Sequence, residues 1–584
     1  MASIVAGTFH QATPNLSPVA TKACQASSSY GPVPVTGNGA LATRKVPPFL
    51  KSLFHTSRNK FLDVLVDALY KPDKERNIYY QENFSPVEEV GSWTPVQVID
   101  GEIPQDFPAG TYIRNGPNPY LLDESILISP FGKLYCHWFE GDGMLHATRF
   151  DQGGKFITYK NKYVDTMAHK IEKNTKKTSF LRAVEGDSLA ISASYLLNFL
   201  RFGKVNGPTC NTHVFKLAGK LYAVAEADIP HEIDLSSLNT LGTLDFSGKW
   251  KGPFTSHSKF DLEKQELVIF GFNAKSPYLQ IGIVSKDGDL IQKTDLELDR
   301  ACFIHEISIT KNYTLIPDFP LTINMNRLLK GSGRLVEFEN NSSSRIGVMP
   351  RYGDSKSVRW FEVEPGYSFH AVNAFEDSDE IVLHALFSKI PFFPTPNGVD
   401  RREWFARGIT PTDPRNARDP QVDGALLANL REWRFNLDKG TVVERNLTSL
   451  ETCGIEMPKI NKKFTGRKNQ FAYAQVVDVE ASKVVGMPKY GKFMKVKLPE
   501  SCEDEIDVKY HDLGANRYGS EPLFVARPHS TDEDDGWIVS YVHDEETNKS
   551  EVYIFDAQKF QDQAVARIGL PQRVPYGFHS DFFF

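Results

Sequence analysis

Short runs of strand-forming residues, separated by turn residues, dominate the sequence from about residue 90 onward. Glycine-containing turns such as Gly141-Asp142-Gly143, Asp287-Gly288 and Asp535-Gly536 punctuate these runs. Long helical patterns are few after residue 205, so the spacing predicts an all-β fold with inserted helices. No repeat of fixed period is visible, and the number of sheets cannot be derived from the pattern. The clearest predicted strands are Leu221–Ala225, Leu267–Phe272, Ile281–Val284, Ile381–Phe387, Trp537–Val542 and Val552–Phe555.

The size and charge of the chain exclude several classes of protein. With 584 residues the chain is longer than most single domains, so it forms several domains or one large closed architecture such as a propeller or barrel. The formal net charge of −6, without a dense basic block in the folded part, argues against nucleic acid as a partner. No apolar run reaches the roughly 18 residues that a membrane-spanning helix needs. The six cysteines include no CxxC pair and are interpreted as buried thiols in a reducing compartment.

The N-terminal segment differs in composition from the rest of the chain. Residues 1–62 contain no acidic residue, six Lys or Arg and thirteen Ser or Thr. This composition is typical of an organellar transit peptide, although a disordered tail without a targeting role would look similar. We therefore expect residues 1–45 to be a transit peptide or a disordered tail.

Two further segments have the spacing of amphipathic helices. Apolar residues recur at helical spacing from Phe49 to Leu69 and predict a helical segment within residues 46–84. A second helix is predicted from Ile191 to Phe202. Such helices usually cover a core, yet basic and aromatic flanks also suit one leaflet of a membrane. The pattern leaves both interpretations open.

Four of the fifteen histidines have a local context that suggests a buried imidazole with a functional role. Three of them lie beside bulky apolar residues, where an imidazole needs a hydrogen bond or a metal to offset its desolvation. Neutral imidazoles suit a borderline metal such as iron(II), whose six-coordinate preference would leave two positions open. A structural role for each histidine remains the alternative. The four candidates are His257, His305, His370 and His579.

A series of motifs resembles the plant carotenoid cleavage dioxygenases of the carotenoid oxygenase superfamily. These motifs lie in the family's order over roughly residues 80–584. They are Thr111-Tyr112-Ile113-Arg114-Asn115-Gly116-Pro117-Asn118-Pro119, Phe139-Glu140-Gly141-Asp142-Gly143-Met144-Leu145-His146, Ala225-Glu226-Ala227-Asp228-Ile229-Pro230, Glu521-Pro522-Leu523-Phe524-Val525 and Val574-Pro575-Tyr576-Gly577-Phe578-His579.

The resemblance implies a seven-bladed β-propeller over residues 85–584, with inserted helices forming a cap over the active-site face. It implies that Fe(2+) is held by the four candidate histidines, and that Glu226, Glu456 and Glu521 accept the imidazole N–H bonds and orient the rings. Two departures stand out: Glu306 follows His305 where relatives commonly carry Asp, and His231 follows Pro230 where Tyr is usual. We interpret His231 as a surface residue rather than a fifth ligand.

The resemblance also implies the reaction. We expect oxidative cleavage of a carotenoid or apocarotenoid double bond with O2 as co-substrate, giving two carbonyl products. An aromatic tunnel is expected to select the bond that is cleaved. We also expect peripheral contact of the protein with one membrane leaflet or a plastoglobule. The alternatives are cleavage of a stilbene-type double bond, retinoid-type isomerisation, or carotenoid binding without catalysis. The N-terminal composition favours a plastid (chloroplast or chromoplast), with the cytoplasm as the alternative. Because the chain ends five residues after His579, the last strand is expected to be less firmly closed.

Overall fold

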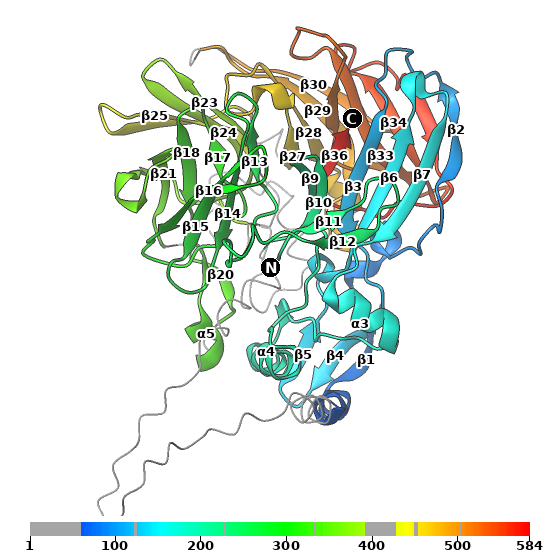
Figure 1. Cartoon of the computed structure of the whole chain (residues 1–584), viewed down its shortest axis with the longest axis vertical. Coiled ribbons are helices and arrows are strands. Elements are labelled where there is room, and N and C mark those ends of the chain that lie inside the picture. Colours follow the sequence, from blue (N-terminus) through cyan, green and yellow to red (C-terminus); the bar gives the residue numbers. More distant parts are fainter. Residues whose placement is uncertain are drawn as a thin grey trace, which may run out of the picture.

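Strands form most of the molecule, and the helices gather with one small sheet at one end (Figure 1). The structure is a computed structural model. It describes residues 60–584 except 77, 122–124, 227, 332, 340, 392–427, 449–453 and 502–503. All six clearest strands predicted from the sequence are strands in the structure.

Five antiparallel four-stranded sheets follow one another along the chain. The first sheet contains β9 (His213–Leu217), β10 (Lys220–Val224), β11 (His231–Ile233) and β12 (Thr240–Thr243), and the second contains β13 (Lys259–Asp261), β14 (Glu266–Phe272), β15 (Leu279–Ser285) and β16 (Leu290–Leu296). The third contains β17 (Ser308–Ile309), β18 (Tyr313–Asp318), β21 (Ser344–Pro350) and β22 (Arg359–Val363), and the fourth contains β23 (Tyr367–Asp377), β24 (Glu380–Ser388), β25 (Asn429–Asn436) and β26 (Thr441–Asn446). The fifth contains β27 (Ile455–Lys459), β28 (Phe471–Val477), β29 (Tyr490–Lys497) and β30 (Asp507–Asp512).

A ten-stranded sheet joins the two ends of the described chain. Its strand order is β31-β33-β34-β35-β2-β7-β6-β3-β36, and β32 pairs with β33. The strands are β31 (Arg517–Gly519), β32 (Leu523–Ala526), β33 (Gly536–Asp544), β34 (Lys549–Asp556), β35 (Ala566–Gly569), β2 (Thr94–Gly101), β7 (Ile157–Tyr163), β6 (Gly143–Phe150), β3 (Gly110–Pro117) and β36 (Ser580–Phe583). Since β36 pairs with β3 from Arg114↔Ser580 to Thr111↔Phe583, the expectation of a poorly closed last strand is wrong.

The sheets pack face to face around a shared centre. Phe215 and Tyr222 of one sheet, for example, share a buried cluster with Ile269 and Val284 of the next. Burial of both faces explains why strands such as β14 are nearly continuous apolar runs rather than strict alternations. The edge strands also meet: β9 contacts β3 and β36, β36 contacts β32, and β23 contacts both β17 and β27. The first strands of successive sheets therefore surround a common axis.

The helical end contains residues 60–69, α3 (Met167–Thr175), α4 (Ser188–Phe202) and α5 (Met325–Lys330) (Figure 1). Beside them lie a small sheet of β1 (Lys71–Arg76), β4 (Ser125–Ser129), β5 (Gly132–Tyr135) and β8 (Glu185–Gly186), and the pair β19 (Leu321–Ile323) and β20 (Val336–Phe338). The remaining helix, α7, spans Val479–Val485, and 3-10 turns span Ile78–Tyr80, Glu82–Phe84, Trp138–Glu140, Gln152–Gly154, Ser355–Ser357 and Lys462–Phe464.

The predicted helix from Ile191 to Phe202 is confirmed as part of α4, which ends where Gly203 adopts a left-handed conformation. The segment 46–84 is helical only in part. Residues 60–69 form a helix, but Lys71–Arg76 forms β1, because Pro72 cannot continue a helix and disfavours helical geometry in the residue before it. Residues 46–59 lie outside the described part, as do the predicted tail and three of the six cysteines. Of the others, Cys210 and Cys302 are buried free thiols and Cys136 is half-buried.

Candidate metal centre

The four candidate histidines converge at the centre of the ring of sheets. Each comes from an edge strand of a different sheet or from the residues just before it: His257 precedes β13, His305 precedes β17, His370 lies in β23 and His579 precedes β36. One ring nitrogen from each lies within 4.8 Å of those of the other three. His305 Nε2 and His370 Nε2 are only 3.2 Å apart. The sequence motifs thus identified four residues that the fold brings together.

Local structure explains how two of these side chains reach the centre. In β23 the pairing with β24 shifts in register between Ser368 and Ala371, an irregularity that redirects the side chain of His370. Before His579, Gly577 lies so close to Arg114 that an added Cβ would fall 1.3 Å from the guanidinium Nη1. Backbone bonds then hold His579: its N–H donates to the Thr212 carbonyl and its carbonyl accepts from the N–H of Asn115. The glycine in the Tyr-Gly-Phe-His motif is therefore required by a close approach.

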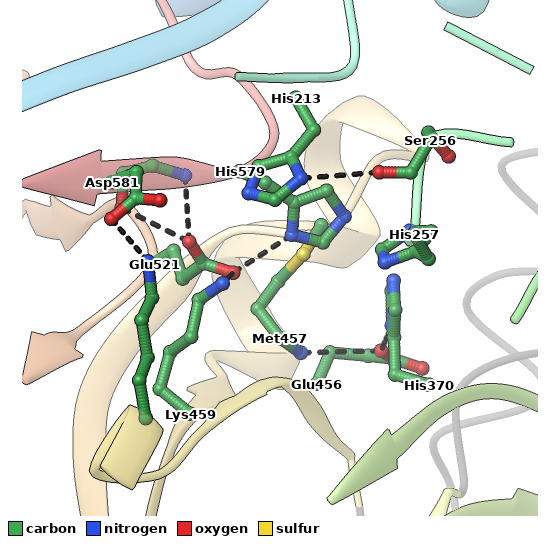
Figure 2. A network of polar contacts seen from close by, with 12 residues as sticks. His213, Ser256, His257, His370, Glu456, Met457, Lys459, Glu521, His579 and Asp581 are labelled. Atoms are coloured by element: carbon green, nitrogen blue, oxygen red, sulfur yellow. Dashed lines mark hydrogen bonds and ion pairs between the residues drawn. The ribbon is translucent and has the colours of Figure 1, made fainter. Parts of the chain in front are cut away.

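A glutamate carboxylate lies beside Nδ1 of three of the imidazoles. His370 Nδ1 lies 2.6 Å from a Glu456 carboxylate oxygen, and His579 Nδ1 lies 2.8 Å from Glu521. His305 Nδ1 lies 2.5 Å from Glu226. At His370 and His579 the carboxylate accepts a bond from Nδ1–H, so the unprotonated Nε2 of these two rings is left to face the centre. Figure 2 shows the Glu456–His370 and Glu521–His579 pairs beside His257.

Electrostatics in the cluster favour neutral His257 and His579 and an ionised Glu226. Burial and the neighbouring imidazoles lower the pKa values of His257 and His579 well below the usual value. Burial opposes ionisation of Glu226, but the adjacent His305 lowers its pKa below the usual value of a carboxyl group. At His370 burial acts to lower the pKa, and Glu456 outweighs it and raises the pKa. Neutral imidazole is the form that binds a metal.

The donor set fits a metal ion. His257 Nε2 is buried and has no hydrogen-bond partner among the described residues, which is costly unless a ligand occupies the space it faces. The Nε2 atoms of His305 and His370 lie 3.2 Å from each other. Four neutral nitrogen ligands without a carboxylate suit a borderline divalent ion such as iron(II).

The site also contains residues that the sequence analysis missed. Glu306 is buried, lies 3.6 Å from His257 Nδ1, accepts the Ala371 N–H at 2.7 Å and pairs with Lys259. Its position after His305 was noted as a departure, but nothing in the sequence connects it to His257. Lys459 lies 3.0 Å from Glu521.

His213 is the nearest additional imidazole, with its ring centroid 5.5 Å from that of His579. No motif in the sequence pointed to it. His231 is buried in β11, so its predicted surface position is wrong, although it is not in the group of four clustered histidines.

A largely apolar cavity opens onto the histidine cluster. His305, His370 and His579 lie in its wall, whereas His257 does not. Two polar side chains in the wall have protein partners: Gln475 donates to the Gly519 carbonyl at 2.7 Å and Tyr576 donates to Glu545 at 2.9 Å. The apolar part of the wall includes Trp138, Phe139, Phe303, Phe369, Met457, Met487, Tyr490 and Phe578. The cavity therefore suits a long hydrocarbon ligand.

Comparisons with known proteins agree with this geometry. Residues 84–584 match the family model described as "Retinal pigment epithelial membrane protein". The chain is 31% identical over 533 residues to a carotenoid 9,10(9',10')-cleavage dioxygenase of Crocus sativus, covering 87% of this chain and 90% of the relative. It is 30% identical to a chloroplastic 9-cis-epoxycarotenoid dioxygenase of Oryza sativa subsp. japonica, covering 90% of this chain and 78% of the relative.

Solved structures show the same fold. A lignostilbene dioxygenase of Pseudomonas brassicacearum aligns with a TM-score of 0.71 at 22% identity, covering 88% of this chain and 99% of that one. A variant of the Synechocystis apocarotenoid oxygenase aligns with a TM-score of 0.68 at 23% identity, covering 86% and 98%. The chain therefore belongs to the retinal pigment epithelial membrane protein family, within the carotenoid oxygenase superfamily, and to its dioxygenase class of enzymes.

Proposed function

We propose that His257, His305, His370 and His579 hold Fe(2+) and that the protein cleaves a carbon–carbon double bond of a carotenoid or apocarotenoid with O2, giving two carbonyl fragments. The observation that carries this proposal is the convergence of four imidazole nitrogens within 4.8 Å at the wall of an apolar cavity. Bound iron(II) would supply the activation of O2, since no side chain performs that chemistry alone. The relatives named above as carotenoid dioxygenases support the substrate class.

The protein's own residues orient the metal ligands and exclude water from the cavity. Glu226, Glu456 and Glu521 fix the Nε2 direction of three ligands, so they act on the metal rather than on the substrate. The aromatic wall holds an extended hydrocarbon and keeps water away from it. Because Gln475 and Tyr576 in the wall already have protein partners, these two side chains are not free to bind a polar substrate.

The proposed architecture is a seven-bladed propeller. Five four-stranded sheets supply five blades. The ten-stranded sheet supplies two more if it divides between β35 and β2, where strands from opposite ends of the chain meet. The approach of the first strands to a common axis supports this arrangement.

Peripheral membrane contact is proposed at the helical end. Among the described residues no helix is both long and apolar enough to span a bilayer. However, Leu189 and Leu196 of α4 are 61% and 57% exposed, and Phe61 and Val64 of the helix at 60–69 are each 67% exposed. Leu197 and Ile191 instead face the core, so only part of the predicted apolar face is free. Four inserted apolar side chains, at about 1.5–3 kcal/mol each, suffice for reversible binding to one leaflet.

Plastid location is proposed from residues 1–62 and from relatives named as chloroplastic. Product analysis tests the reaction: purified protein loaded with iron(II) should convert defined carotenoids under O2 into pairs of aldehydes or ketones. An isomerised product without cleavage, or cleavage only of a stilbene-type phenolic offered in parallel, would replace the carotenoid assignment by one of the alternative reactions. Binding without turnover would indicate a carotenoid-binding protein.

A further inference from the structure

His257 differs from the other three clustered histidines in how it is oriented. Glutamates lie 2.5–2.8 Å from Nδ1 of His305, His370 and His579. Among the described residues the nearest carboxylate to His257 Nδ1 is that of Glu306, at 3.6 Å, which is beyond hydrogen-bonding distance. Glu306 is also engaged with Lys259 and the Ala371 N–H. The direction of the His257 ring must therefore have another source.

The backbone immediately before His257 is held from two sides. The Ser256 hydroxyl donates to Glu226 at 2.8 Å, and the Ser256 carbonyl accepts a bond from His213 Nδ1 at 3.1 Å. The His257 N–H donates to the Thr255 hydroxyl at 2.8 Å. Ser256 and Thr255 are both buried, so these bonds are shielded from water. Glu226 also pairs with His305, which couples the two ligand positions.

His213 has a defined hydrogen-bonding role. It begins β9, and its ring lies 6.2 Å from that of His257 and 5.5 Å from that of His579, measured between centroids (Figure 2). A carbonyl oxygen only accepts, so Nδ1 of His213 carries the proton. Burial lowers the pKa of His213 well below its usual value, which keeps the ring neutral. His213 is not part of the cavity wall, so its loss would not reshape the space for substrate.

We propose that His213 is a positioning residue: its Nδ1–H bond to the Ser256 carbonyl, opposite the Ser256–Glu226 bond, fixes the backbone before His257 and thereby aims His257 Nε2 at the metal. The inference rests on the proposed metal-dependent function. In this proposal, the two bonds to Ser256 orient His257, whereas a carboxylate next to Nδ1 orients each of the other three histidines.

The test uses substitutions that separate the two ring nitrogens. Asn places a side-chain NH₂ where Nδ1 stands, whereas Gln places its amide where Nε2 stands. Full-length wild-type, His213→Ala, His213→Asn and His213→Gln proteins are loaded with Co(II), whose visible spectrum reports ligand geometry, and with iron(II), whose retention is measured against a chelator. His384→Ala is the control, because His384 is a more deeply buried histidine that is bonded to Glu432 outside the site.

We expect His213→Ala to change the Co(II) spectrum and to weaken metal retention by about 10-fold or more, the lower end of the range for outer partners of ligands. His213→Asn should restore both the spectrum and the metal retention. His213→Gln should behave like His213→Ala, and His384→Ala should behave like the wild type. Rescue by Gln instead of Asn, a wild-type spectrum in His213→Ala, or equal metal loss in His384→Ala would overturn the proposal. If His213→Ala does not fold, the Asn–Gln comparison decides. Failure of the wild type itself to bind metal or cleave carotenoid would refute the proposed function instead.

Discussion

Replacing Glu521 by Gln tests whether a glutamate tunes the metal centre through His579. Glu521 accepts bonds on both carboxylate oxygens. One oxygen lies 2.8 Å from His579 Nδ1 and 3.0 Å from the Lys459 ammonium. The other accepts the Ser580 N–H at 2.7 Å. Gln has one acceptor oxygen. If that oxygen keeps the bond to His579, the amide NH₂ faces the Ser580 N–H, which is also a donor.

The magnitude follows from this conflict. An unsatisfied buried donor costs about 1–3 kcal/mol, and the neutral amide also loses the stronger pull of the carboxylate on the imidazole N–H. We therefore expect Glu521→Gln to lower metal affinity or turnover by about 10–100-fold, which is less than the loss caused by removing a ligand. The assay is iron retention against a chelator, with turnover measured on the folded fraction.

Glu432→Gln provides the matched control. Glu432 is as buried as Glu521 and also pairs with a histidine, His384, at 2.9 Å, but it lies outside the site. It should lose stability and retain wild-type metal affinity. If Glu521→Gln behaves in the same way, with lower stability but unchanged iron retention per folded molecule, Glu521 is structural and the reasoning fails.

Three further predictions concern the rest of the molecule. Residues 1–62 fused to a fluorescent reporter should direct it into plastids, whereas a cytosolic reporter would contradict the transit-peptide assignment. Replacing the exposed α4 leucines Leu189, Leu196 and Leu200 by Ser should release the protein from liposomes, and unchanged co-sedimentation would count against membrane contact. Burial opposes ionisation of Glu432, but its histidine and arginine partners lower its pKa from 4.5 to about 2. The pKa of Glu432 is lower in the folded than in the unfolded state, so the ionised carboxylate stabilises the folded protein by about 2 kcal/mol after allowance for solvent screening. This stabilisation is present above pH 4.5 and is lost as the pH falls towards 2. Acid unfolding followed by circular dichroism should therefore show a weaker pH dependence over this range in Glu432→Gln, and identical curves would refute the assignment.

The strands could be predicted from the sequence because burial on both faces produces local apolar runs. The run Leu267–Phe272, for example, became β14 with one additional residue at its start. The pairing of the two ends of the chain could not be predicted in this way. The pairing of β36 with β3 joins residues more than four hundred positions apart, and no local pattern encodes such a contact. The apolar spacing ends at Leu69, where the helix at 60–69 also ends, but the predicted helical segment was carried on to residue 84 across Pro72, which instead lies in β1.

The candidate metal site was predictable only through the family motifs. An isolated histidine beside apolar residues is common, and the residues alone left a structural role open for each of the four. The motifs also identified Glu226, Glu456 and Glu521, which lie next to three of the imidazoles. The relation of Glu306 and His213 to His257 could not be predicted, because it depends on how three separate strands meet and neither residue stands at a motif position known to bear a role.

Removal of His370 tests the central claim most directly. His370 Nε2 lies 3.2 Å from His305 Nε2, and its Nδ1 bonds to Glu456, so His370→Ala deletes one of the four proposed ligands and leaves a buried carboxylate without its partner. Iron content and turnover of a carotenoid substrate are measured on the soluble, folded fraction of wild type and variant. The account predicts that the variant retains neither iron nor turnover. A folded His370→Ala protein with normal iron content and full activity would contradict it.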